Sequence, residues 1–217
     1  TQSIDTMREA VSALTAYGVT VVPTLAKVLS NSMEDPSIRR AVSQVLGRLG
    51  TNESVALITK HLGDSDELLR ARLYKALAKA VKGHRLVLGD LSSVQQALER
   101  ELKAAYTALS QAEQLGLGAG PGPDTPRTGV EAAKALLASA LAEKVTQIER
   151  RIFLLLAVLY PDADMEQIYA GIHDAAATDA PRRRANAVEL LDNLLERELK
   201  KRFLPLLEEL PRPERLK

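Results

Sequence analysis

The three histidines, His61, His84 and His173, are the first residues to test for chemistry, because imidazole can ligate a metal or act as a general base near neutral pH. They lie far apart in the sequence. None has a second histidine at the HxxH or HExxH spacing that places two rings on one face of a helix. We therefore expect surface or partly packed histidines and predict no metal site.

The other side chains that commonly act in catalysis, cysteines and carboxylates, form no recognisable catalytic set either. Cysteine is absent, which excludes disulfides, thiolate nucleophiles and cysteine-ligated metals. Carboxylates are numerous, but most stand where helix N-caps and solvated helix faces are expected. They include Glu9, Asp64, Asp66, Asp162, Asp164, Asp174, Glu189, Asp192 and Glu196. We predict no catalytic residue and no cofactor.

A glycine-rich stretch, GLGAGPGPDTPRTG at residues 116–129, is the only segment that suggests a phosphate loop. A phosphate loop follows a strand and leads into a helix through a Gly-Lys-Ser/Thr sequence, and neither feature occurs here. The glycines and prolines instead predict a flexible connection between two helices.

Arginines recur near helix starts and on helix faces, and they are the candidate interaction residues. In a stack of repeats, equivalent positions form a row along one surface, and such a row could bind an acidic peptide, a phosphate or an anionic lipid. The alternative is pairing with Asp or Glu of a neighbouring repeat. The predicted set comprises Arg39, Arg40, Arg70, Arg72, Arg150, Arg151, Arg182, Arg183 and Arg184.

The elements that carry these arginines repeat along the chain. Apolar residues at steps of three and four predict a helix over residues 36–50, with Ile38, Val42, Val45 and Leu49 facing inward and Arg39 facing outward. The segments PSIRRAVSQVLGRLG and DELLRARLYKALAKA align at an offset of 31 residues, and RRRANAVELLDNLLE aligns with the first at an offset of 144. A looser copy, DTMREAVSALTAYG, lies about 31 residues upstream of the first. Repeated helix pairs of this length indicate stacked α-hairpins.

Two longer helices interrupt the repeats. One runs from about residue 91 to 115, and the next runs from about 130 to 160 with a leucine-rich stripe that begins at Leu137. The chain closes with a helical hairpin over residues 179–210. Its first helix has Asp179 as the expected cap and a buried stripe of Ala185, Val188, Leu191 and Leu195.

We therefore predict an all-α fold, an α-solenoid of antiparallel helical hairpins of HEAT or armadillo type with about ten helices and no strand. We expect one domain over residues 1–217. It would consist of regular repeats over 1–89, two long helices joined by the loop 116–129 over 90–160, and further repeats over 161–217.

Composition limits the partners. The net charge is +1 and aromatic residues make up 3% of the chain without any tryptophan, so neither a global basic field nor a set of base-stacking platforms is present. The longest strongly apolar patch, residues 152–160, is roughly half a membrane span. The chain begins at Thr1 and ends in LPRPERLK, and we expect it to be a segment of a longer protein.

The helix pairs resemble HEAT repeats, on the segments at residues 36–50 and 64–80. The sequences ERRIFLLLAVLYP, residues 149–161, and RRRANAVELLDNLLERELKKRFLPLLEE, residues 182–209, resemble a narrower group. These are bacterial membrane proteins in which a transporter-like domain similar to ATP/ADP translocases is followed by a soluble HEAT domain. The resemblance implies a cytoplasmic adaptor or regulatory domain on the cytosolic face of a membrane protein, without transport activity or membrane insertion of its own.

The sequence thus favours a non-catalytic protein-interaction scaffold or regulatory domain, whose partner is another protein or another domain of the same polypeptide. The alternative from a different class is a nucleic-acid-binding protein of the HEAT-like DNA glycosylase type, which the near-neutral charge and the absence of tryptophan disfavour. Binding of nucleic acid is accordingly not expected. A bilin-handling HEAT protein and regulation by a nucleotide or anionic lipid at the arginine rows are further alternatives.

Overall fold

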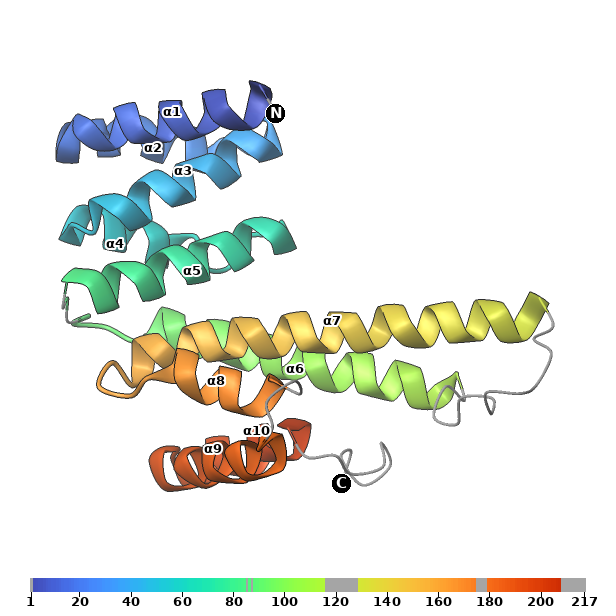
Figure 1. The fold of residues 1–217 in the computed structure, drawn as a ribbon. Coiled ribbons are helices and arrows are strands. Elements are labelled where there is room, and N and C mark those ends of the chain that lie inside the picture. The colour runs from blue at the N-terminus through green and yellow to red at the C-terminus, as the bar shows by residue number, and fades with distance from the viewer. Residues whose placement is uncertain (1, 85, 87, 116–128, 175–178, 208–217) are drawn as a thin grey trace. The chain divides into compact units, whose positions relative to one another are not determined.

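The computed structural model describes residues 2–84, 86, 88–115, 129–174 and 179–207. Within these residues the chain forms α-helices joined by short connections, with one 3-10 helix and no strand (Figure 1). The α-helices are α1 Gln2–Ala16, α2 Val22–Ser30, α3 Pro36–Leu49, α4 Asn52–Lys60, α5 Glu67–His84, α6 Ser92–Gln114, α7 Gly129–Leu159, α8 Met165–His173, α9 Ala180–Leu194 and α10 Arg197–Leu207, and the 3-10 helix is η1 Gly18–Val21. The predicted fold class, an all-α solenoid of helical hairpins with about ten helices, is confirmed.

The chain divides into two compact units. Unit 1 comprises Thr1–Leu98 with Leu154–Ala163, and unit 2 comprises Glu99–Phe153 with Asp164–Lys217. The predicted division of a single domain at residues 89/90 and 160/161 stays a prediction. Of the predicted loop 116–129, residues 116–128 lie outside the described residues, and Gly129 is the first residue of α7.

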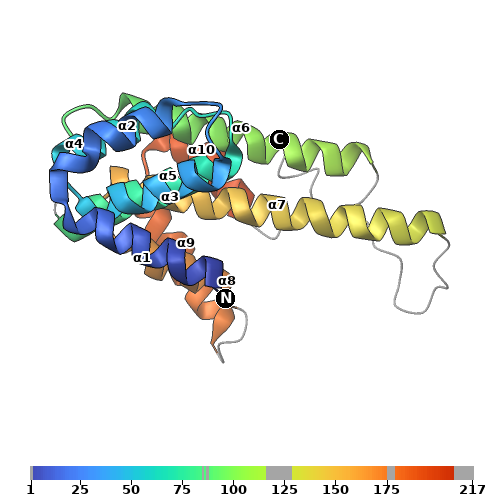
Figure 2. The ribbon, with the colours of Figure 1, turned by 90° about the horizontal axis from the view of Figure 1, so that it is seen from above.

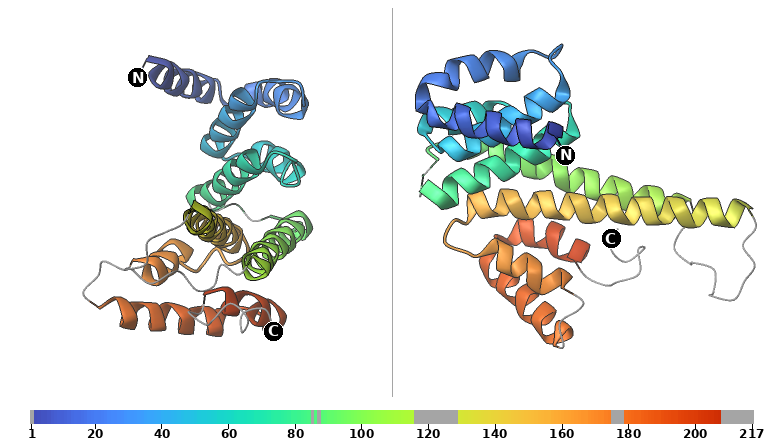
Figure 3. Two further views of the ribbon diagram at one scale, coloured as in Figure 1. Left: turned by 90° about the vertical axis from the view of Figure 1, so that its right-hand side faces the viewer. Right: turned by 45° about the horizontal axis from the view of Figure 1, so that its top comes forward.

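In unit 1 the helices form two layers. Helices α1, α3 and α5 follow one another in one layer, and α2 and α4 form the other (Figure 3). Their core is aliphatic, with fully buried side chains such as Leu46 on α3 and Leu77 on α5. Helices α3 and α5 approach closely at Gly47, where an added Cβ would lie 2.9 Å from the Cα of Ala76. Glycine is therefore needed at position 47 because the facing backbone occupies the space of a side chain.

Side chains cap several of the helix starts. The Asp35 carboxylate accepts a hydrogen bond from the Ser37 N–H at 2.7 Å, and Asp164 accepts from the Gln167 N–H at 3.3 Å. Thr51 and Ser54 form a reciprocal capping box at the start of α4. The prediction that the Asp179 side chain caps α9 is correct in position but wrong in the hydrogen bond. That residue occupies the N-cap position of α9, but its side chain makes no capping hydrogen bond.

In unit 2, α6 and the N-terminal part of α7 lie side by side and run antiparallel, and their far end extends beyond α8, α9 and α10 (Figures 1 and 2). Helices α8 and α9 pack closely, since an added Cβ at Gly171 would lie 3.2 Å from the Cβ of Ala187. Phe153 of α7 meets Tyr169 and Phe203 edge-on, with ring centroids 5.2 and 5.4 Å away. These rings connect α7 to α8 and α10.

Three expected burial patterns are wrong in detail. On α3 the predicted orientation of two neighbours is reversed, because Ile38 is 43% exposed and Arg39 is 8% exposed. The leucine stripe of α7 is buried from Val145 onward, but Leu137 is 43% exposed. On α9, Ala187 is buried and Ala185 is exposed.

No single helix in the described part of the chain has both the length and the apolar character needed to cross a membrane. One pair, Thr6–Ala16 with Gly18–Ser30, meets the criteria only when the two are taken together, and it is bent by 115°.

Candidate binding groove

The predicted arginines of unit 1 are mostly engaged within the fold. The Arg39 guanidinium donates to the Leu29 carbonyl through Nε at 3.1 Å and Nη2 at 2.9 Å, and Nη2 lies 2.5 Å from the Asp64 carboxylate. Arg40 pairs with the Asp66 carboxylate at 2.8 Å. These contacts are the intramolecular pairing that the sequence left open.

The last two predicted arginines of unit 1 differ from each other. Arg70 donates to the carbonyls of Asp64 and Ser65, at 2.7 and 3.2 Å. Arg72 is exposed on α5.

The predicted arginines of α7 belong to unit 2 and also have partners. Arg151 is 5% exposed and its Nε lies 2.8 Å from a carboxylate oxygen of Glu101, which is itself buried, so this pair fixes α6 against α7. Arg150 stacks over the Tyr169 ring, 4.4 Å from its centroid, and its Nη2 lies 3.3 Å from the Glu166 carboxylate.

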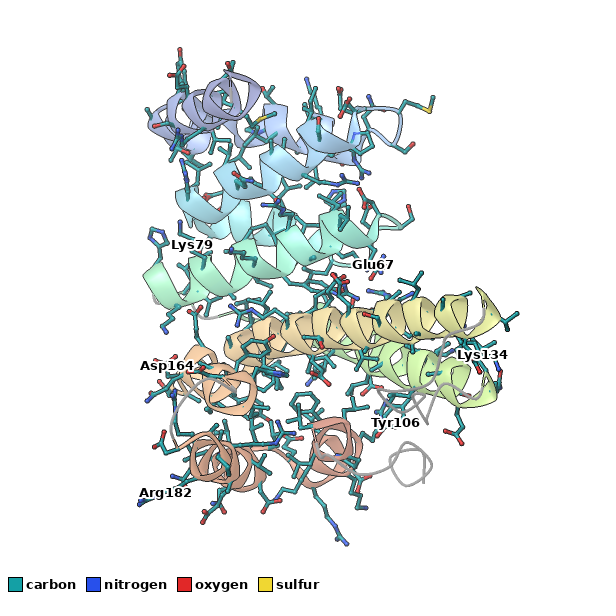
Figure 4. All side chains as sticks on the ribbon, turned by 45° about the vertical axis from the view of Figure 1, so that its right-hand side comes forward. Glu67, Lys79, Tyr106, Lys134, Asp164 and Arg182 are labelled. Atoms are coloured by element: carbon teal, nitrogen blue, oxygen red, sulfur yellow. The ribbon has the colours of Figure 1, made fainter. Side chains whose placement is uncertain are left out.

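The three arginines of α9 are placed differently from one another. Arg184 donates to the Ile172 carbonyl at 3.0 Å and to the Leu207 carbonyl, and thereby joins the ends of α8 and α10. Arg183 pairs with Asp174 at 3.1 Å. Arg182 is exposed and points outward from α9 (Figure 4).

The titratable groups of the described residues form no metal site, since no cluster of three or more His, Cys, Asp or Glu residues occurs among them. His173 is partly buried against the Tyr169 ring, and its Nε2 lies 3.5 Å from the Glu149 carboxylate. Burial lowers the pKa of His173, and the charges of Arg184 and Arg150 lower it further. This histidine is therefore a packed residue that resists protonation.

A groove lined by several cations lies on unit 2 between α6 and α7. Its volume is about 300 Å³, and it is open to solvent along one side. The residues that line it are Arg100, Lys103, Ala104, Thr107, Ala108 and Gln111 of α6 and Lys144 of α7. Three of these side chains are cationic and none is anionic, so the groove favours an anionic ligand.

The spacing along α6 explains the groove. Arg100, Lys103, Thr107 and Gln111 follow one another at steps of three, four and four, which places them on one face of the helix. The opposite face of α6 is buried, as at Leu102 and Leu109. Lys103 and Lys144 are exposed and have no ion pair among the described residues. Their charges are therefore available to a ligand.

Helix α10 supports the outer side of α6. The Tyr106 hydroxyl donates to the Arg202 carbonyl at 2.8 Å, and the Arg202 guanidinium pairs with Glu99 at 2.7 Å (Figure 4). Burial raises the pKa of Tyr106, and the hydrogen bond with Glu99 raises the pKa of Arg202. Near neutral pH, Tyr106 is therefore a neutral hydrogen-bond donor and Arg202 is a cation, as these two contacts with α10 require.

The lining residues were not among the predicted contacts. The prediction used arginines that recur at repeat positions, whereas the groove uses two lysines and one arginine outside those positions. The usable signal was the unbroken polar face of α6 at helical spacing, together with the predicted proximity of two long consecutive helices.

Comparison with known proteins finds a similar family for the N-terminal region only. Residues 1–78 match the family model of HEAT repeats, which covers α1 to α4 and most of α5. No curated protein and no solved structure shows significant similarity to the chain. The similarity to HEAT repeats therefore extends over residues 1–78.

Proposed function

We propose that this chain is a non-catalytic protein-interaction scaffold that binds an acidic segment of a partner in the α6–α7 groove. The observation that carries the proposal is the charge of the groove, where Arg100, Lys103 and Lys144 line one cavity without a carboxylate. The HEAT repeats of residues 1–78 agree with this function, because stacked helical repeats create extended binding surfaces.

The geometry favours an acidic peptide over a single small anion. The groove is open, and its cations come from two helices and from positions one turn or more apart, so they do not converge on one point. Each exposed pair contributes about 0.2–1 kcal/mol, and measurable affinity therefore requires several carboxylates at once. Such binding weakens as salt screens the charges.

The test measures binding of a labelled glutamate-rich peptide of about fifteen residues by fluorescence anisotropy at low and high salt. We expect the double variant Lys103→Glu and Lys144→Glu to weaken binding about tenfold or more, because each reversal replaces an attraction by a repulsion. The matched control is Lys75→Glu with Lys79→Glu, two exposed lysines one turn apart on α5 (Figure 4 labels Lys79). Equal weakening by both double variants would contradict a specific site.

A DNA duplex serves as the second probe, because cations in a groove also suit phosphates. Tighter binding of the duplex than of the peptide, with a steep salt dependence, would overturn the protein-scaffold proposal in favour of nucleic-acid binding. The low aromatic content disfavours that result.

We also propose that the domain is the cytosolic part of a larger transporter-like membrane protein. The proposal is motivated by the resemblance expected from the sequences of residues 149–161 and 182–209. The complete gene product tests it. Membrane-spanning segments flanking the chain would support the proposal, and their absence on both sides would overturn it.

Within the predicted arginine rows, the proposal retains Arg72 and Arg182 as further contact residues, since both are exposed. Charge reversal at either position is expected to weaken binding of a long acidic partner by less than the groove variants do, because neither residue lines the groove.

A further inference from the structure

Exposed apolar side chains occur on α7 and at the end of α6. Leu115, the residue that follows α6, is 47% exposed, and Leu137 and Val130 of α7 are 43% and 68% exposed. Single exposed apolar side chains are common on protein surfaces, but a contiguous group marks a binding surface. The question is therefore whether these three residues lie together and next to the cations.

The register of the hairpin places them together. Glu101 pairs with Arg151 at 2.8 Å, and Ala108 shares the groove with Lys144. Because α6 and α7 run antiparallel, each step forward on α6 corresponds to one step back on α7. Counting from the Glu101–Arg151 pair, seven steps bring Ala108 level with Lys144, in agreement with the groove lining, and seven more bring Leu115 level with Leu137.

The helical faces agree with this register. On α7, residues 130, 133, 137, 140 and 144 follow at steps of three and four, so Val130, Leu137 and Lys144 share one face. On α6, Ala104, Ala108, Gln111 and Leu115 do the same. The basic groove around Lys103 and Lys144 is thus followed along the hairpin by an apolar part around Leu115 and Leu137.

We propose that the occupant of this groove is an amphipathic α-helix of a partner protein, acidic in one half and apolar in the other. This inference rests on the proposed function and specifies the partner. The distance from Arg100 to Leu115 along α6 is about 22 Å at the rise of an α-helix, which matches a partner helix of about four turns. The groove between two adjacent helices is a common binding site for a third, amphipathic helix.

The residues between the two halves suit a helix rather than an extended chain. Ala104 on α6 and Ala140 on α7 carry small, accessible side chains, which let the backbone of an incoming helix approach closely. An extended acidic peptide would satisfy the cations but leave Leu115 and Leu137 exposed. A helix with apolar residues at i, i+3 and i+7 covers both leucines and places its carboxylates about two to three turns later, beside the lysines.

The test compares two peptides of identical composition on the full 217-residue chain. The first is an amphipathic helix with leucines in one half and glutamates in the other. The second has the same residues in an order that destroys the apolar face. We expect the first to bind at least about tenfold more tightly, and we expect its circular dichroism to show helix formation on binding.

The variants separate the two halves of the groove. Leu115→Gln with Leu137→Gln is expected to weaken the amphipathic peptide about tenfold and to leave the scrambled peptide unchanged. The control is Leu190→Gln on α9, where the leucine is 57% exposed; it should change the binding of neither peptide. Because all three leucines are exposed, these variants are expected to fold, and circular dichroism verifies this.

Each outcome is decisive. If both peptides bind equally and the leucine variants have no effect, the helical partner is wrong while the basic groove remains a binding site. If neither acidic peptide binds, the proposed function itself fails. If light scattering shows a dimer that the leucine variants dissociate, a second copy of the chain occupies the groove and the inference is overturned.

Discussion

Replacement of Arg39 by methionine tests how the N-terminal helices are held together. Arg39 is 8% exposed on α3 and connects two other elements, the last turn of α2 through the Leu29 carbonyl and the loop before α5 through Asp64. Methionine keeps much of the side-chain volume and removes all three polar contacts. The Asp64 carboxylate, 11% exposed, then loses its cation in a poorly solvated place.

The expected loss of stability follows from these contacts. Breaking a buried pair by removing one partner costs about 3–5 kcal/mol, and residual solvent contact of both side chains reduces this to about 2–4 kcal/mol. For a chain of this size the change corresponds to a fall in Tm of about 5–15 °C. Thermal unfolding followed by far-UV circular dichroism measures it.

The neighbouring arginine provides the control. Arg40 pairs with Asp66 at 2.8 Å, but the side chains are 31% and 20% exposed, so Arg40→Met should cost only about 0.5–1 kcal/mol. The double variant Arg39→Met with Asp64→Asn should be more stable than the sum of the two single changes predicts, because it leaves no unpaired charge. Equal Tm values for Arg39→Met and Arg40→Met would refute the reasoning.

Three further predictions concern the core, the pH dependence and the helix contacts. Leu191→Asp buries an unpaired charge at a fully buried position and should abolish cooperative unfolding of unit 2, whereas an unchanged urea transition would show that the site tolerates charge. Burial lowers the pKa of His173 and, first among several causes, that of His61. As pH falls below about 6.5, the unfolded chain therefore binds protons that the folded chain resists, and Tm should fall. His173→Gln should reduce that dependence, and an unaltered pH profile of Tm would contradict it. Gly47→Ala should destabilise the fold because the new methyl group meets the backbone of α5. Gly83→Ala has open space around it and should raise Tm, because alanine has a higher helix propensity than glycine. A higher Tm for Gly47→Ala than for Gly83→Ala would exclude the close approach of α3 and α5.

Local structure could be predicted wherever it depends on residues close together in the sequence, as helical spacing and N-capping do. Apolar residues at helical spacing placed the helices, and Asp35, Asp66 and Asp164 stand at helix starts where their carboxylates accept backbone N–H groups. Asp179 obeys the same rule by position but not by hydrogen bonding. An N-cap residue type predicts the boundary of a helix better than it predicts the orientation of its side chain.

Burial was less predictable, because it depends on where neighbouring helices begin and end. The stripe of α7 has one sequence pattern throughout, yet Ile148 is fully buried and Leu137 is 43% exposed. Periodicity identifies which residues share a face, but it does not state how far a neighbour covers that face. The polar face of α6 is visible in the sequence, but it does not by itself identify the α6–α7 groove, because exposed lysines on a helix are ordinary until a second helix brings another lysine close to them.

The arginines show how a pattern can be correct while its interpretation changes. Arg39 donates to the carbonyl of Leu29, the penultimate residue of α2, and Arg184 donates to the carbonyl of Ile172, the penultimate residue of α8. The two contacts lie in different units and are made in the same way. Each satisfies a carbonyl at a helix C-terminus, where backbone acceptors lack partners within the helix and the dipole attracts a cation.

This shared contact also adjusts the repeat alignment. The offset of 144 residues pairs Ala41 with Ala185 and hence Arg40 with Arg184, but the hydrogen bonds make Arg39 the counterpart of Arg184. An arginine early in the second helix of such a pair is thus explained by its hydrogen bond to a free carbonyl at the C-terminal end of the first helix. Its recurrence is therefore no evidence for a ligand. Exposed cations that the fold does not use in this way, such as Lys103 and Lys144 of the groove, are for that reason the better candidates for contact with a partner.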